Sequence, residues 1–263
     1  MKIIKLQGGL GNQMFQYAHG RMLELSGKKV IFDISFFNGS KAKIDTARNF
    51  KLDNFNIETK AVFVSKKTPL LDILKKIQRK LGFKQECFFQ NEKYFKNEEE
   101  QVRREFTLKN PPTDAAEKVL QQISTAKNSV SLHIRRGDYV NNKETNAYHG
   151  VCSPEYYNRA ISVLKEKLGH LSLFVFSDDI EWVKNNLTFP FPTEYVSKHE
   201  IIDCEELILM SHCKHNIIAN STFSWWGAWL NKNPEKIVMA PKQWALKYQE
   251  NFKDIIPETW IKL

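Results

Sequence analysis

A strand–loop–helix–strand pattern opens the chain and constrains its fold more than any other feature. Residues 3–6 form a short apolar run, and a glycine-rich turn follows over residues 7–11. Apolar side chains then recur at helical spacing from Asn12 until Gly27, and Val-Ile-Phe at 30–32 forms a second apolar run. A helix that connects two such runs is typical of a parallel sheet in an α/β protein.

A second series of the same kind begins near residue 129. Ser153 followed by Pro154 is a typical helix start within it. We expect its strands at 130–134, 173–176, 216–219 and 237–240, with helices between them. The sequence therefore predicts two Rossmann-like α/β domains, over residues 1–128 and 129–263.

The stretch between the two series is less regular. Residues 38–70 show no clear period, whereas 70–82 and 98–106 are expected to be helical. Asn110-Pro111-Pro112 is the best candidate for a break in the chain, because two prolines interrupt any helix or strand. Asp114 is expected to cap the helix that follows.

Composition excludes several classes of protein. Of the 263 residues, 42% are hydrophobic and 26% are charged, which is incompatible with disorder over most of the chain. The net charge of +9 favours anionic partners, but the lysines are scattered, so a nucleic-acid-binding arm is not expected. No apolar run is long enough to cross a membrane, and the N-terminus lacks the apolar core of a signal peptide. We expect a cytoplasmic protein whose basic surface can touch the inner membrane peripherally.

Four cysteines are present, and no pair has the C-x-x-C spacing. A chain of this length has a core that needs no disulfides, so we interpret them as reduced thiols. His212, Cys213 and His215 lie close together in the sequence, but their spacing matches no standard zinc signature. A structural role is favoured for all three, and no metal site is expected.

The strongest chemical signal is the segment 133–138, His-Ile-Arg-Arg-Gly-Asp, at the end of an expected strand. Open α/β sheets bind ligands at the carboxyl ends of their strands. Arg135 and Arg136 together favour an anionic ligand such as phosphate, which a guanidinium binds with two parallel donors. Scaffolding is the alternative, with one arginine paired to Asp138. We expect one arginine to face the ligand and the other to face Asp138.

Two further segments follow expected strands. Residues 220–226, Asn-Ser-Thr-Phe-Ser-Trp-Trp, open a helix, where serine and threonine either cap free N–H groups or help to bind an anion. Trp225 is expected in the core, and burial is the default for Trp226, with a sugar platform as the alternative. Asp178 and Asp179 either cap a helix, read a guanine edge or bind a metal, in that order of preference.

The turn at Gly9-Leu10-Gly11 resembles part of a dinucleotide-binding fingerprint. Met14 occupies the third glycine position of that fingerprint, which weakens the match. A tight turn of this kind still lets the backbone approach a ligand closely.

Taken together, residues 8–18, 133–139, 176–179 and 220–227 resemble the motifs of the α-1,2-fucosyltransferases, glycosyltransferase family 11. The motifs span nearly the whole chain in the family's order. The resemblance implies a GT-B-like α/β fold, with two facing Rossmann-like domains and the active site in the cleft between them. It also implies inverting, metal-independent transfer of L-fucose from GDP-fucose to the 2-hydroxyl of a terminal galactose, in bacterial surface-glycan synthesis, with no further cofactor.

The resemblance also implies residue roles. Arg135 would bind the β-phosphate, His133 would approach the nucleoside, and Asp179 or Asp178 would read guanine. Gly9, Gly11, Asn12 and Gln13 would lie on the acceptor side of the cleft. The residues implied to bind the donor are His133, Arg135, Asp178, Asp179, Asn220, Ser221, Thr222, Phe223 and Ser224.

Catalysis without a metal needs a preorganised cation at the leaving phosphate, and Arg135 with a helix N-terminus supplies one. The acceptor hydroxyl also needs a general base. Asp138 stands in the right motif for this role, although holding an arginine explains it at least as well. The sequence alone does not identify the base.

Two other functions are compatible with parts of the sequence. An NAD-dependent or nucleotide-sugar-modifying enzyme would need Met14 to be tolerated in the fingerprint, and no Tyr-x-x-x-Lys pair supports it. A non-catalytic carbohydrate- or nucleic-acid-binding protein would explain the basic charge and the aromatic residues. It would not explain two arginines after a strand together with the 220–226 segment.

Overall fold

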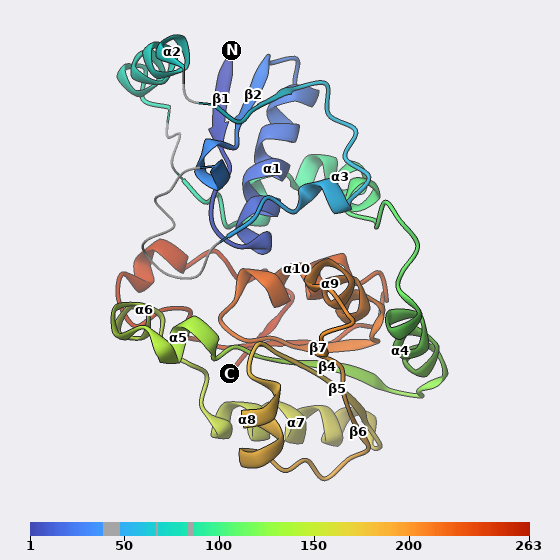
Figure 1. Cartoon of the computed structure of the whole chain (residues 1–263). Coiled ribbons are helices and arrows are strands. Elements are labelled where there is room, and N and C mark those ends of the chain that lie inside the picture. Colours follow the sequence, from blue (N-terminus) through green and yellow to red (C-terminus); the bar gives the residue numbers. More distant parts are fainter. Residues whose placement is uncertain (39–47, 67, 84–86) are drawn as a thin grey trace. The chain divides into compact units, whose positions relative to one another are not determined.

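The computed structural model describes residues 1–38, 48–66, 68–83 and 87–263 and divides the chain into two compact units, Met1–Lys109 and Asn110–Leu263 (Figure 1). The division falls where Pro111 and Pro112 were expected to break the chain. Helix α4, Asp114–Thr125, therefore belongs to the second unit, whereas the expected boundary at 128/129 placed it in the first. The physical reason is packing, because the apolar face of α4 is buried in the core of the second unit.

The first unit contains a three-stranded parallel sheet of order β1-β2-β3, and β1 is therefore an edge strand. Its strands are β1 Lys2–Lys5, β2 Val30–Asp33 and β3 Val62–Val64. Its helices are α1 Leu10–Leu25, α2 Pro69–Lys80 and α3 Glu99–Glu105. Short 3-10 turns lie at Ser35–Asn38, Leu52–Asn54, Glu92–Tyr94 and Lys96–Glu98. The three helices confirm the sequence prediction, but β3 lies in the region where no element was expected, because three residues are too few to show a period.

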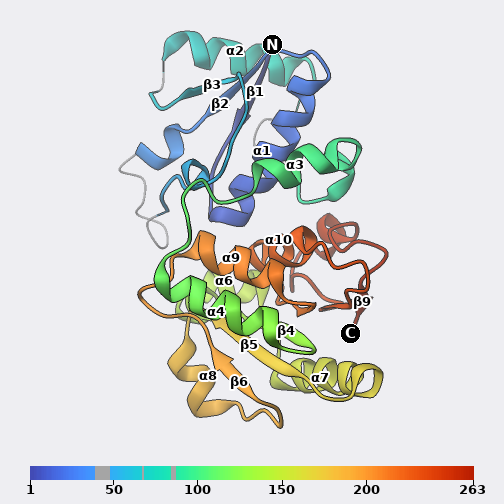
Figure 2. The ribbon, with the colours of Figure 1, turned by 90° about the vertical axis from the view of Figure 1, so that its right-hand side faces the viewer.

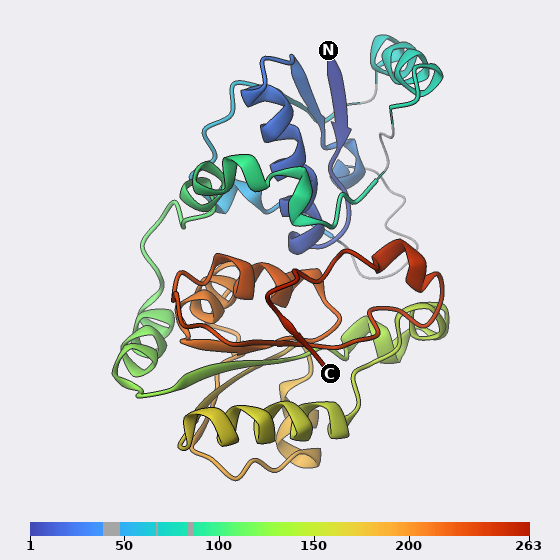
Figure 3. The same ribbon diagram turned by 180° about the vertical axis from the view of Figure 1, so that it is seen from behind.

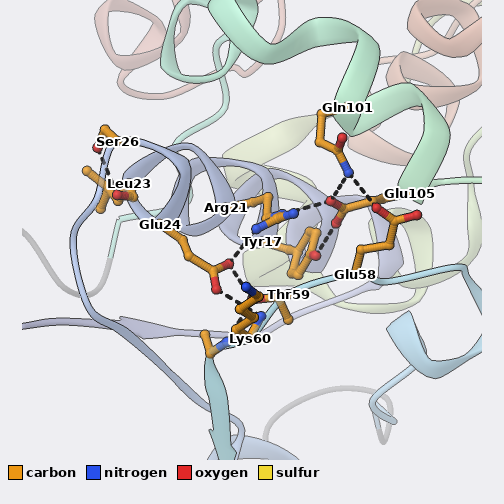
Figure 4. Close-up of polar contacts among 11 residues, drawn as sticks. Tyr17, Arg21, Leu23, Glu24, Ser26, Glu58, Thr59, Lys60, Gln101 and Glu105 are labelled. Carbon is orange, nitrogen blue, oxygen red and sulfur yellow. Dashed lines mark hydrogen bonds and ion pairs between the residues drawn. The ribbon is translucent and has the colours of Figure 1, made fainter.

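A buried polar cluster joins α1 to α3 in the first unit (Figure 4). Arg21 on α1 pairs with Glu105 on α3, with 2.7 Å between Nε and Oε1, and Tyr17 donates its hydroxyl to the same carboxylate. Arg21 also pairs with Glu24 at 2.8 Å, and Glu24 accepts a hydrogen bond from the hydroxyl of Thr59. Because each buried charge has a partner of opposite sign, the desolvation cost of the cluster is offset and the two helices keep one relative orientation.

The second unit contains a six-stranded sheet of order β6-β5-β4-β7-β8-β9, in which every neighbouring pair is parallel. The strands are β4 Ser129–Ile134, β5 Ser172–Ser177, β6 Thr193–Tyr195, β7 His215–Ile217, β8 Val238–Ala240 and β9 Ile261–Lys262. The expected strands at 130–134, 173–176, 216–219 and 237–240 correspond to β4, β5, β7 and β8. The sequence did not predict the short strands β6 and β9.

Helices cover both faces of this sheet (Figures 1 and 3). Leu173 and Val175 pack with α7 (Pro154–Leu168) and α8 (Ile180–Asn186) on one face. Phe174 and Phe176 on the same strand pack with α4 and α9 (Asp203–His212) on the other face. Figure 2 shows α4 and α9 side by side on that second face. The remaining helices of this unit are α5 Gly137–Asn141, α6 Lys143–His149 and α10 Thr222–Leu230, with a 3-10 turn at Gln249–Phe252. This is the two-faced α/β layering expected from the alternating sequence.

The helix caps agree with the sequence in part. Ser153 caps α7 as predicted, with its hydroxyl accepting the backbone N–H of Tyr156. Thr113 rather than Asp114 caps α4, because its hydroxyl accepts the N–H of Ala116. Trp225 and Trp226 are fully buried, so Trp226 offers no exposed platform for a sugar. None of the described helices has the length and apolarity needed to cross a membrane.

Candidate active site

The candidate site lies at the carboxyl edge of the second sheet, where β5, β4 and β7 are neighbours. Ile134 at the end of β4 is paired with Ser177 at the end of β5, and Leu132 is paired with Ile217 on β7. The residues that follow these strands therefore meet at one edge. They are Arg135 and Arg136 after β4, Asp178 and Asp179 after β5, and the 220–224 segment after β7.

Each arginine pairs with an acid from the neighbouring strand. The distance between Nη1 of Arg135 and Oδ2 of Asp178 is 2.8 Å, and that between Nε of Arg136 and Oδ2 of Asp179 is 3.2 Å. The backbone N–H of Arg136 also donates to Asp178 at 2.9 Å. Two ion pairs made across strands therefore hold the arginines, and the expectation that Asp138 also holds one of them stays a prediction. Asp138 itself lies in α5, and its side chain is outside the described part of the chain.

Aromatic rings support the arginines. The guanidinium carbon of Arg136 lies 3.3 Å from the ring centroid of Trp182 on α8, and that of Arg135 lies 5.3 Å from the ring centroid of Tyr139 on α5. The arginine side chains are only 16% and 19% exposed. An arginine held by both a carboxylate and an aromatic face loses little further freedom when an anion binds, so the site is preorganised.

Gly137 is required at this edge because Asp178 comes very close to it. A Cβ atom at position 137 would lie 2.3 Å from Oδ2 of Asp178 and 2.9 Å from its Cγ. Any other residue there displaces the carboxylate that holds Arg135 and the N–H of Arg136. The sequence analysis missed this role, although the Arg-Arg-Gly-Asp order contained the signal.

His133 on β4 is neutral at physiological pH. Burial, reinforced by the nearby Arg135 guanidinium, lowers its pKa to about 3. The side chain is 3% exposed, its ring centroid lies 5.6 Å from that of Phe223, and Nδ1 has no hydrogen-bond partner among the described residues. A neutral imidazole beside the arginines can donate or accept one hydrogen bond, but it cannot add a positive charge.

Two side chains of the segment after β7 are hydrogen-bonded within the fold. The Asn220 amide donates to three backbone carbonyls, those of His149, Gly150 and Trp244, at 3.1 to 3.3 Å. Ser224 is buried and donates to the Ser221 carbonyl. Both side chains are therefore occupied within the fold.

Ser221 is the N-cap residue of α10, but its hydroxyl makes no capping hydrogen bond. Thr222 and Phe223 begin the helix and are half-buried. Capping is therefore not the role of the Ser221 hydroxyl, and anion binding at this helix start stays a prediction.

Asp179 occupies the N-cap position of α8 and likewise makes no capping hydrogen bond with its side chain. The preferred interpretation of the acidic pair as a helix cap is therefore wrong, and pairing with arginine is the observed role. No group of three or more histidine, cysteine or acidic residues capable of holding a metal occurs among the described residues. His215 uses Nδ1 to accept the N–H of Ile237, and Cys213 is buried, in agreement with structural roles.

Glu206 on α9 belongs to the same neighbourhood and was not singled out from the sequence. Burial raises the pKa of its carboxyl to about 7, the negative charges of Asp203 and Asp178 add to the rise, and a hydrogen bond with Ser197 opposes it. Ser197 in turn accepts the N–H of Ser177 at the end of β5. No local sequence signal distinguishes Glu206, because Asp203 and Glu205 are acids in the same first turn of α9.

The four residues expected on the acceptor side all lie in the first unit, at the start of α1. Gln13 is fully buried, and its amide binds three backbone groups, the carbonyls of Gly8 and Asn49 and the N–H of Lys51. It therefore shapes the turn and does not line an open surface. Asn12 is half-buried and accepts a hydrogen bond from Gln90 at 2.8 Å.

Gly9 and Gly11 flank the first residue of α1 in the same turn. Close helix–strand packing, which the third fingerprint glycine would provide, comes from Gly20 instead, where a Cβ would lie 2.4 Å from the Phe32 ring. Met14 is consequently free to be a core residue, and it is fully buried.

Comparisons with known proteins agree with the motifs. The family model described as Glycosyl transferase family 11 matches residues 1–263. An α-1,2-colitosyltransferase of Escherichia coli is 38% identical, with 99% of this chain and 98% of that protein covered. The O-antigen biosynthesis glycosyltransferase WbnK of Escherichia coli is 32% identical, with 98% and 99% covered. The solved structure of NodZ α-1,6-fucosyltransferase soaked with GDP-fucose has a TM-score of 0.52 at 12% identity, with 87% and 91% covered, and it supports the GT-B-like fold.

Proposed function

Because the chain belongs to glycosyl transferase family 11, we propose that it transfers L-fucose from GDP-fucose to the 2-hydroxyl of a terminal galactose, with inversion. One observation carries the proposal. Two preorganised arginines and the free start of α10 lie at the carboxyl edge of one parallel sheet, where α/β enzymes bind nucleotides.

The chemistry of the proposed step matches this arrangement. Breaking the bond between fucose and the β-phosphate leaves negative charge on GDP while positive charge develops on the sugar. Arg135 would stabilise the leaving phosphate, aided by the N–H groups at the start of α10. Asp178 would act as a positioning residue for Arg135, and Asp179 with Trp182 would position Arg136. Ser221 and Thr222 would donate hydroxyl hydrogen bonds to the phosphates.

The remaining donor contacts stay proposals. Neutral His133, with Phe223 against its ring, would face the nucleoside. Reading of guanine by Asp178 or Asp179 would have to use the carboxylate lone pairs that the arginines leave available. Asp138 is retained as the candidate general base, because the acceptor hydroxyl must lose a proton as it attacks.

We also propose that the transfer needs no metal and that the protein acts in the cytoplasm on a bacterial surface glycan. Arg135, Arg136 and the start of α10 supply the positive charge that a divalent cation would otherwise provide at the phosphates. The similarity to an O-antigen biosynthesis glycosyltransferase supports the surface-glycan role. The second unit is proposed to bind the donor and the first unit, through Gly9, Gly11 and Asn12, to approach the acceptor.

A colitose donor is the second candidate, since the relative with 38% identity is named as a colitosyltransferase. Colitose lacks the 3-hydroxyl of fucose, so the two donors differ by one polar group. A site built to bind that hydroxyl would discriminate against colitose strongly, whereas a site that leaves it in water would not.

Identification of the product from each donor tests the proposal. The protein is incubated with lactose and either GDP-fucose or GDP-colitose, and kcat/KM and the linkage in the product are measured. We expect an α-linked product at the 2-hydroxyl of galactose and faster transfer of fucose. Faster transfer of colitose would show that GDP-colitose is the preferred donor and would leave the assignment of the site unchanged. No product from either donor with any galactoside would overturn the proposed function.

A further inference from the structure

Helix α2 of the first unit is attached to its sheet through an unusually polar face. The Gln78 side chain is 5% exposed and accepts the backbone N–H of Ile3 at 3.1 Å, on the edge strand β1. Lys75 pairs with the buried carboxylate of Asp33 on β2. Leu71 is 3% exposed and adds an apolar contact to this face. The inner side of α2 thus contacts the sheet through the polar side chains of Lys75 and Gln78 as well as through Leu71.

The opposite side of α2 is apolar and exposed. Ile73, Ile77 and Leu81 are 54%, 48% and 77% exposed. They are spaced four residues apart and therefore form one stripe along the helix and its first following residue. A helix at a protein surface normally turns its apolar side to the core and its polar side to water. On α2, which Figure 1 labels, three large aliphatic side chains are instead exposed in one row, and this indicates a partner for the apolar stripe.

Positive charge borders the stripe. Lys76 and Lys80 follow Ile73 and Ile77 by three residues, so they form a parallel row beside the apolar one, and both are exposed. Arg79 adds a further exposed cation in the last turn. Long basic side chains beside an apolar stripe can extend upward to anionic groups while the aliphatic residues are buried below.

We infer that α2 docks the first unit on an anionic lipid bilayer. Its axis lies parallel to the surface, Ile73, Ile77 and Leu81 enter the boundary between headgroups and acyl chains, and Lys76 and Lys80 bind lipid phosphates. A bilayer fits better than a second copy of the chain, because a self-interface would bring these lysine rows together, and lysine is depleted at protein interfaces. The net charge of +9 favours the same partner.

Binding to vesicles tests the inference independently of transfer. The whole protein is sedimented with sucrose-loaded vesicles of phosphatidylcholine, with or without phosphatidylglycerol. We expect binding that requires phosphatidylglycerol and weakens as salt is added. The triple variant Ile73→Gln/Ile77→Gln/Leu81→Gln should bind at least about tenfold less tightly. Lys76→Gln/Lys80→Gln should lose about fivefold for each lysine.

Matched controls separate α2 from the surface at large. Leu25→Gln replaces another exposed aliphatic residue in the first unit, and Lys165→Gln/Lys167→Gln removes the same charge from α7. These controls should bind vesicles like the wild type. All α2 variants should keep the wild-type Tm and the wild-type transfer rate to soluble lactose, because the replaced side chains are exposed and lie outside the candidate site.

Three results would overturn the inference. The first is that the wild type does not bind vesicles that contain phosphatidylglycerol, and the second is that the α2 variants bind these vesicles as tightly as the wild type. The third is that the wild type binds no vesicles and sediments as a dimer, whereas the triple variant sediments as a monomer. The last result would assign the stripe to a second copy of the chain. If the protein binds vesicles as expected but transfers no sugar to lactose, the proposed function is contradicted and the inference about α2 still holds.

Discussion

At the scale of single residues, the cross-strand pairs of Arg135 with Asp178 and of Arg136 with Asp179 decide what the second unit can bind. The acids fix the guanidinium groups at the carboxyl edge of the sheet. Removing one partner from such a partly buried pair leaves an uncompensated charge, which costs more than the net stabilisation by the pair itself. The arginines are therefore held in place before any ligand arrives.

The sequence indicated the arginines and the acids but not their pairing. The adjacent Asp138 was the natural partner to expect, because it lies only a few residues from both arginines. Asp178 and Asp179, which pair with the arginines, lie more than forty residues away and become neighbours of the arginines only because β5 lies next to β4 in the sheet. Strand order is not contained in the local pattern, so neither this pairing nor the contact between Arg136 and Trp182 could be predicted.

Glu206 makes a prediction about pH and stability. Its pKa is raised from 4.5 to about 7 in the folded protein, mainly by burial. Between these values the unfolded chain has lost the proton while the folded chain keeps it, so stability falls as the pH rises through this window. Glu206→Gln removes this loss and should raise the free energy of unfolding relative to the wild type by at most about 3 kcal/mol at pH 8.

The measurement is the Tm of both proteins at pH 5 and pH 8. The wild type should lose more Tm than Glu206→Gln between the two values. Glu200→Gln, a change at an exposed acid of the same unit, serves as the control and should follow the wild type. Parallel behaviour of wild type and Glu206→Gln would show that the carboxyl is ionised throughout.

At the scale of elements, the corner between β4 and α5 is the most demanding part of the site. It must turn the chain sharply after Ile134 and leave space for Asp178 from the next strand. The long strands and the amphipathic helices could be read from the sequence, because their periods extend over many residues. Short elements such as β3, β6, β9 and α5 could not, since tertiary contacts determine them more than local pattern does.

The variant Gly137→Ala tests whether the corner between β4 and α5 needs a residue without a side chain at position 137. The added Cβ meets Oδ2 of Asp178 and forces the carboxylate away from Arg135 and from the N–H of Arg136. We expect kcat/KM to fall by roughly 10²-fold, within the range seen when one stabilising group is lost. Tm should fall by only a few degrees, on the order of 1 kcal/mol.

A double-mutant cycle identifies the cause. If the alanine acts by displacing Asp178, then Gly137→Ala combined with Asp178→Ala should be no slower than Asp178→Ala alone. Additive losses in the cycle would mean that Gly137 is needed for another reason.

At the scale of the whole molecule, the chain consists of two compact α/β units. The second carries the arginine pairs and the open start of α10, and the first carries the glycine turn and the outward apolar face of α2. The tandem alternation of strands and helices predicted the two parallel sheets, and the break at Pro111 and Pro112 predicted where the units part. The exposure of Ile73, Ile77 and Leu81 on α2 could not be predicted, because an amphipathic helix shows the same pattern whichever side faces the sheet.

Arg135 is proposed to stabilise the leaving GDP in a transfer that needs no metal. The most direct test is the release of GDP from GDP-fucose in the presence of lactose and EDTA, for the wild type and Arg135→Ala. Arg159→Ala, a change at an exposed arginine on α7, controls for the loss of charge.

We expect acceptor-dependent GDP release that persists in EDTA, is unchanged in Arg159→Ala and falls roughly 10²–10³-fold in Arg135→Ala. Wild-type release from Arg135→Ala in EDTA would contradict the claim, as would a wild-type activity that EDTA abolishes and added divalent cation restores.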